Sequence, residues 1–510
     1  MNISLSFIPS PVPSTTLTLE QSAAIQWIST SPGNLILDAV AGSGKTFTLI
    51  EQIIAINLAY PSATIALMAF NSKVAAELKA KAASRKLRNT TVGTVHSFGY
   101  TACKTALGSH IRPDGDKLKK LLKPLLTPHR LTWKASSPIC RLVSLGKDTL
   151  RTDWLELKEQ FDHTMPEEVT PEKLVQVCDQ LLEASNDYIK TRSPEPIDFS
   201  DQLYLPLKNR WEFQKYDFVF VDEAQDTNLA RRRVVEESLK PESARLIAVG
   251  DPHQAIYGFT GADNDALQQI KEKFQCSTLP LSFSFRCDKA IIREAQKFVP
   301  HIKARDTAGE GVVRKTKEVE FKNSLSTIPP TAAILCRINA PLVRLCFDLL
   351  AKGIACRIEG RDIGFSLVAL IDQHKDSPKG LMPSLWNMVS NSKLTEDKLA
   401  DLQDKVEAID ALAYYYRVKG FKIYPTLRDF ITNLFTDSEP GKPQTCITLS
   451  SIHKSKGLEW DTVYFFGRNL WNPWPYASKP WQLQQEDNLT YVAITRARHE
   501  LVMVDVEERK

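Results

Sequence analysis

The sequence contains none of the patterns that mark a membrane, secreted or zinc-binding protein. No apolar run approaches the roughly 18 residues of a membrane-spanning helix, so we expect no membrane partner. The first basic residue is Lys45, and Pro9, Pro11 and Pro13 interrupt the early apolar residues, which argues against a signal peptide. We expect the proline-rich residues 1–13 to form a mobile tail.

Cysteine never occurs in the spacing of a zinc-ligand pair. The nine cysteines are scattered, and no two of them form a C-x-x-C. This distribution argues against a zinc site and against a disulfide framework, and it fits a reducing compartment. We therefore expect a cytoplasmic location in a bacterial or phage-infected cell, with a nuclear location as the alternative.

The sequence also has no large excess of either charge. Its 65 Lys and Arg residues against 60 Asp and Glu residues leave a net charge of +5, which permits a nucleic-acid partner without indicating one. No internal repeat or low-complexity tract is present. At 510 residues the chain is too long for a single ordinary core, so we expect two or more domains.

A phosphate-binding loop is predicted at "AVAGSGKT", residues 39–46. The preceding "NLILDAV" is typical of a buried strand, and the following "FTLIEQIIAINLA" has the apolar stripe of a helix. Glycines turn backbone N–H groups toward a polyphosphate, the lysine reaches the β- and γ-phosphates, and the threonine hydroxyl binds Mg²⁺. The loop residues that we expect to bind the nucleotide are Ala41, Gly42, Ser43, Gly44, Lys45 and Thr46.

Two further apolar segments end in polar residues that suit nucleotide hydrolysis. "YDFVFVDEAQD" ends in Asp222, which we expect to bind Mg²⁺, and Glu223, which we expect to activate water. In "RLIAVGDPHQAIYGFTGA", Gln254 is placed to reach a γ-phosphate. Tyr257 and Phe259 in the same loop are aromatic residues suited to stacking on bases, although anchoring of the loop is the alternative.

With these segments in place, the sequence resembles the UvrD/Rep group of superfamily 1 helicases from end to end. In the first half the similar stretches are "LTLEQSAAI", "ALMAFNSKVAAEL", "VGTVHSFGY" and "IDFSDQL". The resemblance implies that Gln21 lies on the adenine edge. It also implies that Phe70, Asn71, Thr94 and His96 face single-stranded DNA.

The second half carries four more similar stretches, namely "LPLSFSFRC", "AAILCRINA", "ITLSSIHKSKGLEW" and "NLTYVAITRARHEL". The resemblance implies adenine stacking by Phe285, γ-phosphate contacts by Arg286 and Arg496, and a position near the nucleotide for Gly457 and Glu459. It implies DNA contacts for a further set, which is Arg337, Asn339, Ser451 and His453.

Alternating apolar strands and amphipathic helices predict an α/β fold with parallel sheets. The resemblance implies two RecA-like lobes with ATP in the cleft between them. We expect lobe one at 1–100 and 198–275, interrupted by a helical accessory insertion at 101–197. We expect lobe two at 276–364 and 444–510, interrupted by a reduced helical insertion at 365–443.

Two basic stretches are open to more than one interpretation. Residues 117–123 contain four lysines, and residues 231–233 read Arg-Arg-Arg. A basic helix face is usually solvated, so we interpret both stretches in that way. For the lysine stretch, a contact with DNA is the alternative.

The resemblance implies an ATP-dependent DNA helicase and translocase that moves 3′→5′ on single-stranded DNA, with ATP and Mg²⁺ as cofactors. Hydrolysis needs positive charge at the γ-phosphate, and the arginines of the second half would make it depend on lobe closure. The alternative is a DNA-dependent ATPase motor subunit of a larger nuclease or defence complex, with little unwinding alone. We expect single-stranded and tailed duplex DNA as partners, a monomer or an oligomer on DNA, and room for a partner protein. RNA is not distinguished from DNA by residue type.

Overall fold

The structure is a computed structural model in which the chain divides into two compact units. The first is Met1–Val40 with Gly44–Ser282, and the second is Ala41–Ser43 with Phe283–Lys510. The expected tail at 1–13 and the predicted stacking residue Phe259 lie outside the described residues. The structure describes residues 17–161, 164–191, 196–258, 265–374, 380–392, 396–418, 426–436 and 446–507.

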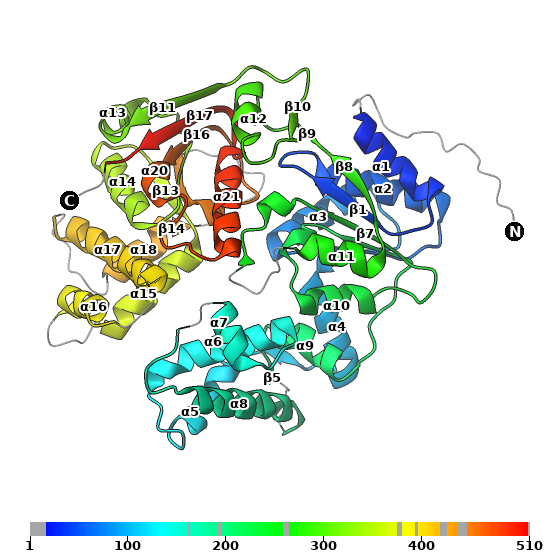
Figure 1. The fold of residues 1–510 in the computed structure, drawn as a ribbon, viewed down its shortest axis with the longest axis horizontal. Coiled ribbons are helices and arrows are strands. Elements are labelled where there is room, and N and C mark those ends of the chain that lie inside the picture. The colour runs from blue at the N-terminus through cyan, green and yellow to red at the C-terminus, as the bar shows by residue number, and fades with distance from the viewer. Residues whose placement is uncertain are drawn as a thin grey trace, which may run out of the picture. The chain divides into compact units, whose positions relative to one another are not determined.

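The first unit contains a six-stranded sheet in which every neighbouring pair is parallel (Figure 1). The strand order is β3-β2-β6-β7-β1-β8, so the chain crosses over repeatedly between neighbours. The strands are β1 (Leu35–Ala39), β2 (Ile65–Ala69), β3 (Thr90–Thr94), β6 (Phe218–Val221), β7 (Arg245–Gly250) and β8 (Ser277–Leu281).

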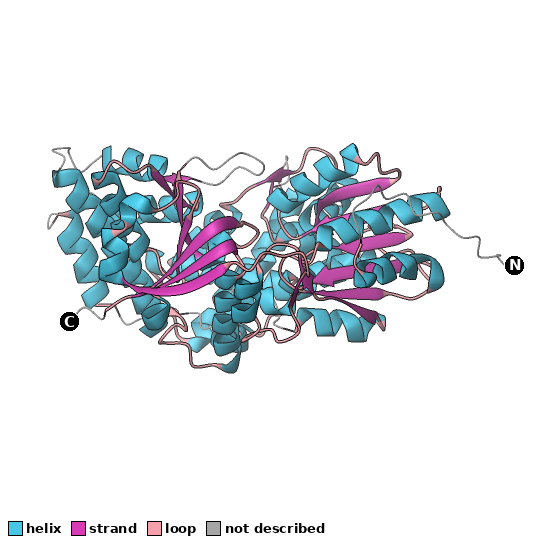
Figure 2. Ribbon diagram, turned by 90° about the horizontal axis from the view of Figure 1, so that it is seen from above, coloured by secondary structure: helices cyan, strands magenta, loops and turns pink. Residues whose placement is uncertain are grey.

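Both faces of this sheet are buried, because successive strand residues point to opposite faces and each face packs on its own set of helices (Figure 2). Along β1, Leu35 and Leu37 join one core and Ile36 the other. The helices on the first face are α1 (Leu19–Thr30), α2 (Lys45–Ala59) and α3 (Ser72–Ser84). Those on the second are α4 (Val95–Leu107), α9 (Asp201–Lys208), α10 (Leu229–Glu237) and α11 (Ala266–Phe274).

Four helices between α4 and α9 form a bundle with its own core, within the segment for which the sequence predicts a helical insertion (Figure 1). They are α5 (Lys117–Leu126), α6 (Ser136–Thr149), α7 (Trp154–Gln160) and α8 (Pro171–Thr191). The short strands β4 (Arg112–Pro113) and β5 (Pro196–Ile197) pair at the base of the bundle, so the chain enters and leaves it side by side.

The second unit contains a seven-stranded parallel sheet in the order β11-β17-β16-β12-β15-β13-β14. Its strands are β11 (Val312–Lys317), β12 (Ala333–Cys336), β13 (Cys356–Glu359), β14 (Phe435–Thr436), β15 (Ile447–Ser451), β16 (Trp460–Phe466) and β17 (Ala497–Asp505). A separate two-stranded pair joins β9 (Phe283–Ser284) and β10 (Lys303–Ala304).

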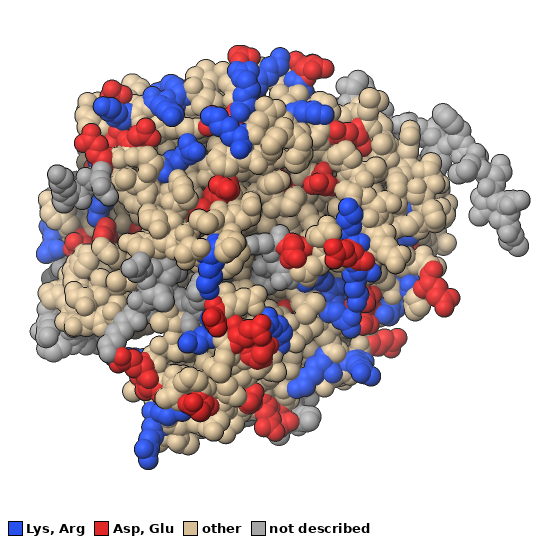
Figure 3. All heavy atoms as spheres, viewed as in Figure 1, with Lys and Arg blue, Asp and Glu red and all other residues tan. Residues whose placement is uncertain are grey.

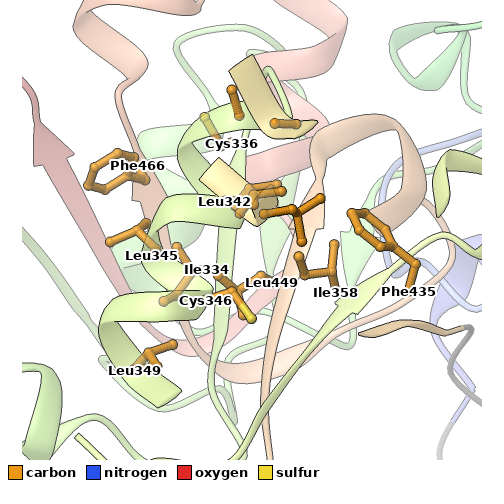
Figure 4. Packing of buried hydrophobic residues seen from close by; sticks show 14 of the residues in the cluster. Ile334, Cys336, Leu342, Leu345, Cys346, Leu349, Ile358, Phe435, Leu449 and Phe466 are labelled. Carbon is orange, nitrogen blue, oxygen red and sulfur yellow. The ribbon is translucent and has the colours of Figure 1, made fainter. Parts of the chain in front are cut away.

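The core of the second unit forms where α14 (Ala340–Ala351) packs on the strands. Ile334 and Leu449 from the sheet meet Leu342 and Leu345 from the helix (Figure 4). The other helices are α12 (Lys289–Ala295), α13 (Glu318–Asn323), α19 (Ile452–Ser455), α20 (Arg468–Trp471) and α21 (Pro480–Ile494).

Four more helices follow β13, where the sequence predicts a reduced helical insertion. They are α15 (Arg361–His374), α16 (Leu381–Ser390), α17 (Glu396–Val418) and α18 (Thr426–Leu434). Their apolar faces join the main core of the unit, for example through Leu367, Ile409 and Ile431. The predicted α/β class with two parallel-sheet lobes is therefore confirmed. Among the described helices, none is long and apolar enough to span a membrane.

Candidate nucleotide site and nucleic-acid interface

The predicted site residues of the first unit follow five neighbouring strands of its sheet. The phosphate loop follows β1, Asp222 follows β6 and the loop that carries Gln254 follows β7, while Phe70 follows β2 and His96 follows β3. In a parallel sheet these carboxyl ends share one edge, which is where α/β proteins bind their ligands. The predicted nucleotide residues therefore follow β6, β7 and β1, and the predicted DNA residues Phe70 and His96 follow the neighbouring strands β2 and β3.

The phosphate loop has the backbone that its glycines predict. Gly42 and Gly44 have φ values of +72° and +78°, in the left-handed region that favours glycine. Helix α2 begins directly after Gly44, and no side chain caps it. The first N–H groups of the helix are thus left for an anion. Residues Ala41–Ser43 of the loop belong to the second unit, where the Ala41 N–H donates to Tyr491 Oη at 2.9 Å. In the same unit, the Phe285 N–H donates to Gly42 O at 2.8 Å.

The loop lysine and threonine meet the paired acids that follow β6. Lys45 Nζ lies 3.2 Å from Glu223 Oε1, and Thr46 Oγ1 lies 3.4 Å from Asp222 Oδ2. Burial works to lower the pKa of Lys45, but the carboxylates of Glu223 and Asp251 outweigh it and the pKa is raised. Lys45 therefore stays charged in its buried position.

Negative charge exceeds positive charge in this cluster. Three carboxylates, those of Asp222, Glu223 and Asp251, face one ammonium, which leaves a formal charge of −2. Burial, followed by the neighbouring Glu223, raises the pKa of Asp222 to about 7. A divalent cation beside Asp222 and Thr46 would balance this charge. Among the described residues there is no group of three His, Cys, Asp or Glu side chains arranged as metal ligands.

A residue that the sequence reasoning missed orients the predicted catalytic acid. Gln225 Nε2 donates to Glu223 Oε2 at 2.5 Å, and its Oε1 accepts the Asp251 N–H at 3.1 Å. Gly250 leaves the necessary space, because a Cβ there would lie 2.5 Å from the Gln225 Oε1. Glu223 itself has a φ of +52°, a strained backbone that is common at active sites. Only its position two residues after Glu223 could have pointed to Gln225.

Two other predicted nucleotide residues of this unit have definite partners. Gln254 Nε2 donates to Asp251 Oδ2 at 2.7 Å, which holds it at the end of β7. Gln21 forms the capping box of α1, where its N–H donates to Thr18 Oγ1 and its Oε1 accepts the Thr18 N–H. The predicted adenine contact of Gln21 stays a prediction.

In the second unit, the two predicted arginine fingers lie in one charged cluster with Glu459. Arg286 Nε donates to Glu459 Oε2 at 2.5 Å, and Arg286 Nη1 donates to Thr495 O at 3.2 Å. Arg496 is 1% exposed and donates to the carbonyl oxygens of Val492 and Leu458. Burial, followed by the charge of Arg286, lowers the pKa of Arg496 to about 9. The cluster holds surplus positive charge, as an anion site requires.

Phe285 and Gly457 lie near this cluster in the sequence. The Arg305 guanidinium lies 4.9 Å from the Phe285 ring centroid, so a cation covers the predicted adenine-stacking side chain. Gly457 has a φ of +86° and ends the turn before Glu459.

Three predicted DNA residues of the first unit belong to two aromatic pairs. Phe70 and Tyr257 are stacked with ring centroids 5.6 Å apart, and His96 is stacked on Phe199 at 4.0 Å. Phe199 is 62% exposed, which is unusual for a large apolar side chain beside a buried histidine. Phe199 belongs to the stretch "IDFSDQL", which carries no predicted DNA contact.

The interpretation of residues 231–233 as a solvated face is wrong for two of the three arginines. The Arg231 guanidinium lies 4.5 Å from the Phe70 ring centroid and donates to Asp226 O at 2.9 Å. Arg232 is buried and donates to Thr227 O and to Gln269 Oε1. Only Arg233 pairs at the surface, with Glu236. Burial, followed by the charge of Arg231, lowers the pKa of His96 to about 3, so this ring is neutral.

Several other predicted DNA residues have structural partners within their own unit. Asn71 caps α3 by accepting the Val74 N–H, and Thr94 caps α4 by accepting the Ser97 N–H. In the second unit, the Asn339 N–H and Nδ2 donate to Asp404, and Ser451 caps α19. Burial, followed by the charge of Arg337, lowers the pKa of His453. Their contacts with DNA stay predictions.

The lysine stretch at 117–123 also differs from its interpretation. Lys117 is buried, and its Nζ lies 2.6 Å from Asp201 Oδ2. Lys147 Nζ lies 2.6 Å from Asp198 Oδ2, 2.7 Å from Asp201 Oδ1 and 2.9 Å from Ser185 Oγ. We call Lys117, Lys147, Asp198 and Asp201 the buried ionic network. It joins helices α5 and α6 of the insertion to the start of α9.

The other lysines of that stretch face solvent. Lys119 pairs with Asp116, and Lys120 pairs with Asp114. On the face in Figure 3, basic and acidic side chains are interspersed rather than gathered by sign. This face therefore does not present a broad basic surface.

These features define a P-loop nucleotide-binding protein with two RecA-like lobes, in which paired acids face the loop lysine and threonine. Family comparison then gives the narrower class. The family model of the UvrD/REP helicase N-terminal domain matches residues 17–275, and that of the UvrD-like helicase C-terminal domain matches residues 447–504. The chain belongs to the UvrD/Rep helicase family.

Curated relatives agree with this family across long alignments. The F-box DNA helicase protein 1 of Schizosaccharomyces pombe is 26% identical over 96% of this chain and 57% of its own length. DNA helicase II of Haemophilus influenzae is 22% identical over 94% of this chain and 82% of its own length. The ATP-dependent DNA helicase Rep of Escherichia coli is 24% identical over 55% of this chain and 43% of its own length. The chain thus spans little more than half of the first relative.

Proposed function

We propose that the protein is an ATP-dependent DNA helicase that moves 3′→5′ on single-stranded DNA. The observation that carries the proposal is the meeting of Lys45 with Glu223, and of Thr46 with Asp222, on the sheet edge that also presents the Phe70–Tyr257 stack. One edge thus offers chemistry for a nucleotide and flat surfaces for bases. The direction of movement rests on the family alone.

In the proposed mechanism, a polyphosphate draws Lys45 away from Glu223. The released Glu223 carboxylate, held by Gln225, then accepts a proton from the attacking water. Thr46 and Asp222 would hold Mg²⁺, which neutralises charge on the phosphates when it is bound. Gln254 would sense the γ-phosphate from the end of β7.

Arg286 and Arg496 would complete the site by stabilising charge on the γ-phosphate after the lobes close. Glu459 is the counterion of Arg286. A γ-phosphate would compete with Glu459 for this guanidinium, so binding of ATP would favour closure. Alternate closing and opening would then move the strand across the aromatic residues of the first unit.

The test is single-stranded-DNA-stimulated ATP hydrolysis by the full chain and three variants. Lys45→Ala and Glu223→Gln should each abolish hydrolysis, whereas Arg496→Ala should keep ATP binding and lose turnover. Lys119→Ala is the control, because this exposed lysine has only a surface partner. Intact hydrolysis in Lys45→Ala would contradict the proposed site, and retained turnover in Arg496→Ala would contradict the finger role.

Unwinding of 3′-tailed, 5′-tailed and blunt duplexes, and of RNA equivalents, tests direction and substrate. Unwinding restricted to 3′-tailed DNA is the expected result. If the purified chain hydrolyses ATP on single strands but separates no duplex, the alternative holds. It would then be a DNA-dependent motor subunit that needs a partner protein. This alternative is supported by the reduced insertion of the second unit, because its helices α15–α18 join the main core of that unit.

A further inference from the structure

The accessible thiols of the chain lie together in the second unit. All nine cysteines are among the described residues, and seven of them are buried. The two that are partly exposed are Cys356, which begins β13, and Cys446, which directly precedes β15. These strands are neighbours, and Ile447 is the register partner of Cys356. Both thiols therefore stand at the amino end of one pair of parallel strands.

A third thiol approaches them from the helix that covers these strands. Cys346 lies on the face of α14 that joins the core, together with Leu342 and Leu349 (Figure 4). Its Sγ lies 3.4 Å from Cys356 Sγ, and Cys356 Sγ lies 3.6 Å from Cys346 O. The two sulfur atoms would need to approach by only about 1.4 Å to reach the length of a disulfide bond.

The two accessible thiols differ in reactivity. The Cys346 thiol donates a hydrogen bond that lowers the pKa of Cys356. Burial raises the pKa of Cys446, and the nearby Arg357 offsets only part of this effect. The thiolate is the form of cysteine that reacts with oxidants. An oxidant that reaches the three thiols should therefore attack Cys356 first.

We propose that Cys356 is a site of reversible oxidation by peroxides, with Cys346 as the thiol that closes a disulfide on it. The geometry carries the proposal, because one sulfur is reached from solvent and a second, buried sulfur lies directly behind it. An accessible thiol beside a resolving thiol is typical of cysteines that respond to oxidants in a reducing compartment. In the described part of the chain, no three Cys, His, Asp or Glu side chains are arranged as metal ligands, so oxidation suits these thiols better than metal binding.

The reaction has two steps, and its oxidant is hydrogen peroxide or an alkyl hydroperoxide. In the first step, the Cys356 thiolate attacks a peroxide oxygen and the O–O bond breaks. The sulfur becomes a sulfenic acid, and the hydroxide or alkoxide that leaves takes up the proton that Cys356 had released. In the second step, the Cys346 sulfur attacks the sulfenic sulfur, the S–S bond forms, and the S–O bond breaks. Hydroxide leaves with the proton of Cys346 as water, so two thiols are oxidised by two electrons and one peroxide is reduced by two.

The disulfide would lie away from the predicted site residues of the second unit. Cys356 stands at the amino end of β13, whereas Arg337 follows β12 and Ser451 ends β15, at the carboxyl edge of the same parallel sheet. The bond would join α14 to β13 across ten residues of chain. A cross-link of this kind stabilises a fold by restricting the unfolded chain. Oxidation should therefore stabilise the second unit and leave its site open.

The test treats the reduced, folded full chain with hydrogen peroxide, blocks the remaining thiols with iodoacetamide and maps disulfides by mass spectrometry of non-reduced peptides. The wild type should lose two of its nine thiols and yield Cys346 bonded to Cys356. Dithiothreitol should restore both thiols. Cys356→Ser should lose this reaction. The matched control is Cys446→Ser, which removes the other accessible thiol and should react like the wild type.

A double variant separates the two steps. Cys346→Ala with Cys446→Ser leaves Cys356 without a neighbouring thiol, so oxidation should stop at the sulfenic acid, which dimedone labels. A wild-type disulfide that contains Cys446, or a folded wild type that keeps all nine thiols, would overturn the proposal. If the double variant does not fold, the two serine variants still decide it.

Thermal unfolding gives a second readout. Oxidation should raise the midpoint of the second unit by about 5–10 °C in the wild type and leave Cys356→Ser unchanged. A lowered midpoint would show that the bond strains the fold and would contradict the pairing. These measurements do not require ATP hydrolysis, so the oxidation site and the proposed function stand or fail separately.

Discussion

Replacement of Lys147 by methionine gives the most demanding test of the first unit. Lys147 is fully buried and bonds to Asp198, Asp201 and Ser185. In the buried ionic network two ammonium groups face two carboxylates, so the charges balance. Lys147→Met keeps the approximate shape of the side chain and leaves two buried carboxylates with only Lys117.

The expected cost is about 3–5 kcal/mol in the free energy of unfolding, which is the usual effect of breaking a buried pair by removing one partner. That is a large part of the roughly 5–15 kcal/mol that stabilises a typical domain. The surface pair Lys120–Asp114 supplies the control, because Lys120→Met should cost at most about 1 kcal/mol. Both lysines belong to the helical insertion, so they report on the same bundle.

Urea unfolding followed by circular dichroism measures the effect, with the transition of the first unit fitted separately because two units need not unfold together. A double variant, Lys147→Met with Asp198→Asn, should recover at least about 2 kcal/mol, since it removes the surplus charge. A cost for Lys147→Met as small as that for Lys120→Met would refute the argument. So would a double variant less stable than the single one.

Three other predictions follow from the same unit. Arg231→Gln should weaken oligo-dT binding, measured by fluorescence anisotropy, about tenfold, because it removes the cation that packs on Phe70. ATP hydrolysis in the absence of DNA, measured by phosphate release, should be unchanged. The pKa of His96 is about 3 in the folded chain and near 6.5 in the unfolded chain. The contribution of His96 to the free energy of unfolding is therefore complete above pH 6.5 and decreases as the pH is lowered toward 3. In His96→Gln, the urea midpoint should depend less on pH over this range. Gly250→Ala should lower the turnover of ATP about tenfold or more by displacing Gln225 from Glu223, while ATP binding measured with a fluorescent analogue stays within about threefold.

Local patterns were enough to predict that the phosphate loop and the paired acids lie together at strand ends. A phosphate loop is a contiguous stretch between a strand and a helix, and Asp222 and Glu223 are contiguous at a strand end. The alternation of strands and helices then places such stretches on one edge of a parallel sheet. The phosphate loop and the paired acids could be predicted because each is a contiguous stretch, so no contact between distant residues had to be known.

The buried ionic network and the position of Arg231 could not be predicted in this way. Lys117 and Asp201 are 84 residues apart, and only the folded bundle shows that one neutralises the other. Arg231 lies in a run of three arginines whose composition is that of a solvated face, yet α10 directs it onto Phe70. Charge type gives the cost of burial but not the identity of the partner that offsets it.

One stretch of chain connects the insertion, the DNA surface and the nucleotide edge. Asp198 and Asp201 are held by lysines of the insertion, and Phe199 between them is turned outward onto His96. The loop after β7 makes a second connection, because Gln254 bonds to Asp251 at the nucleotide edge and Tyr257, three residues later, stacks on Phe70. Under the proposed function, a movement of Gln254 toward a γ-phosphate would therefore displace the Tyr257 ring, which is predicted to stack on bases. The proposed function thus predicts that nucleotide state and grip on the strand are coupled within the first unit, because only two residues separate Gln254 from Tyr257.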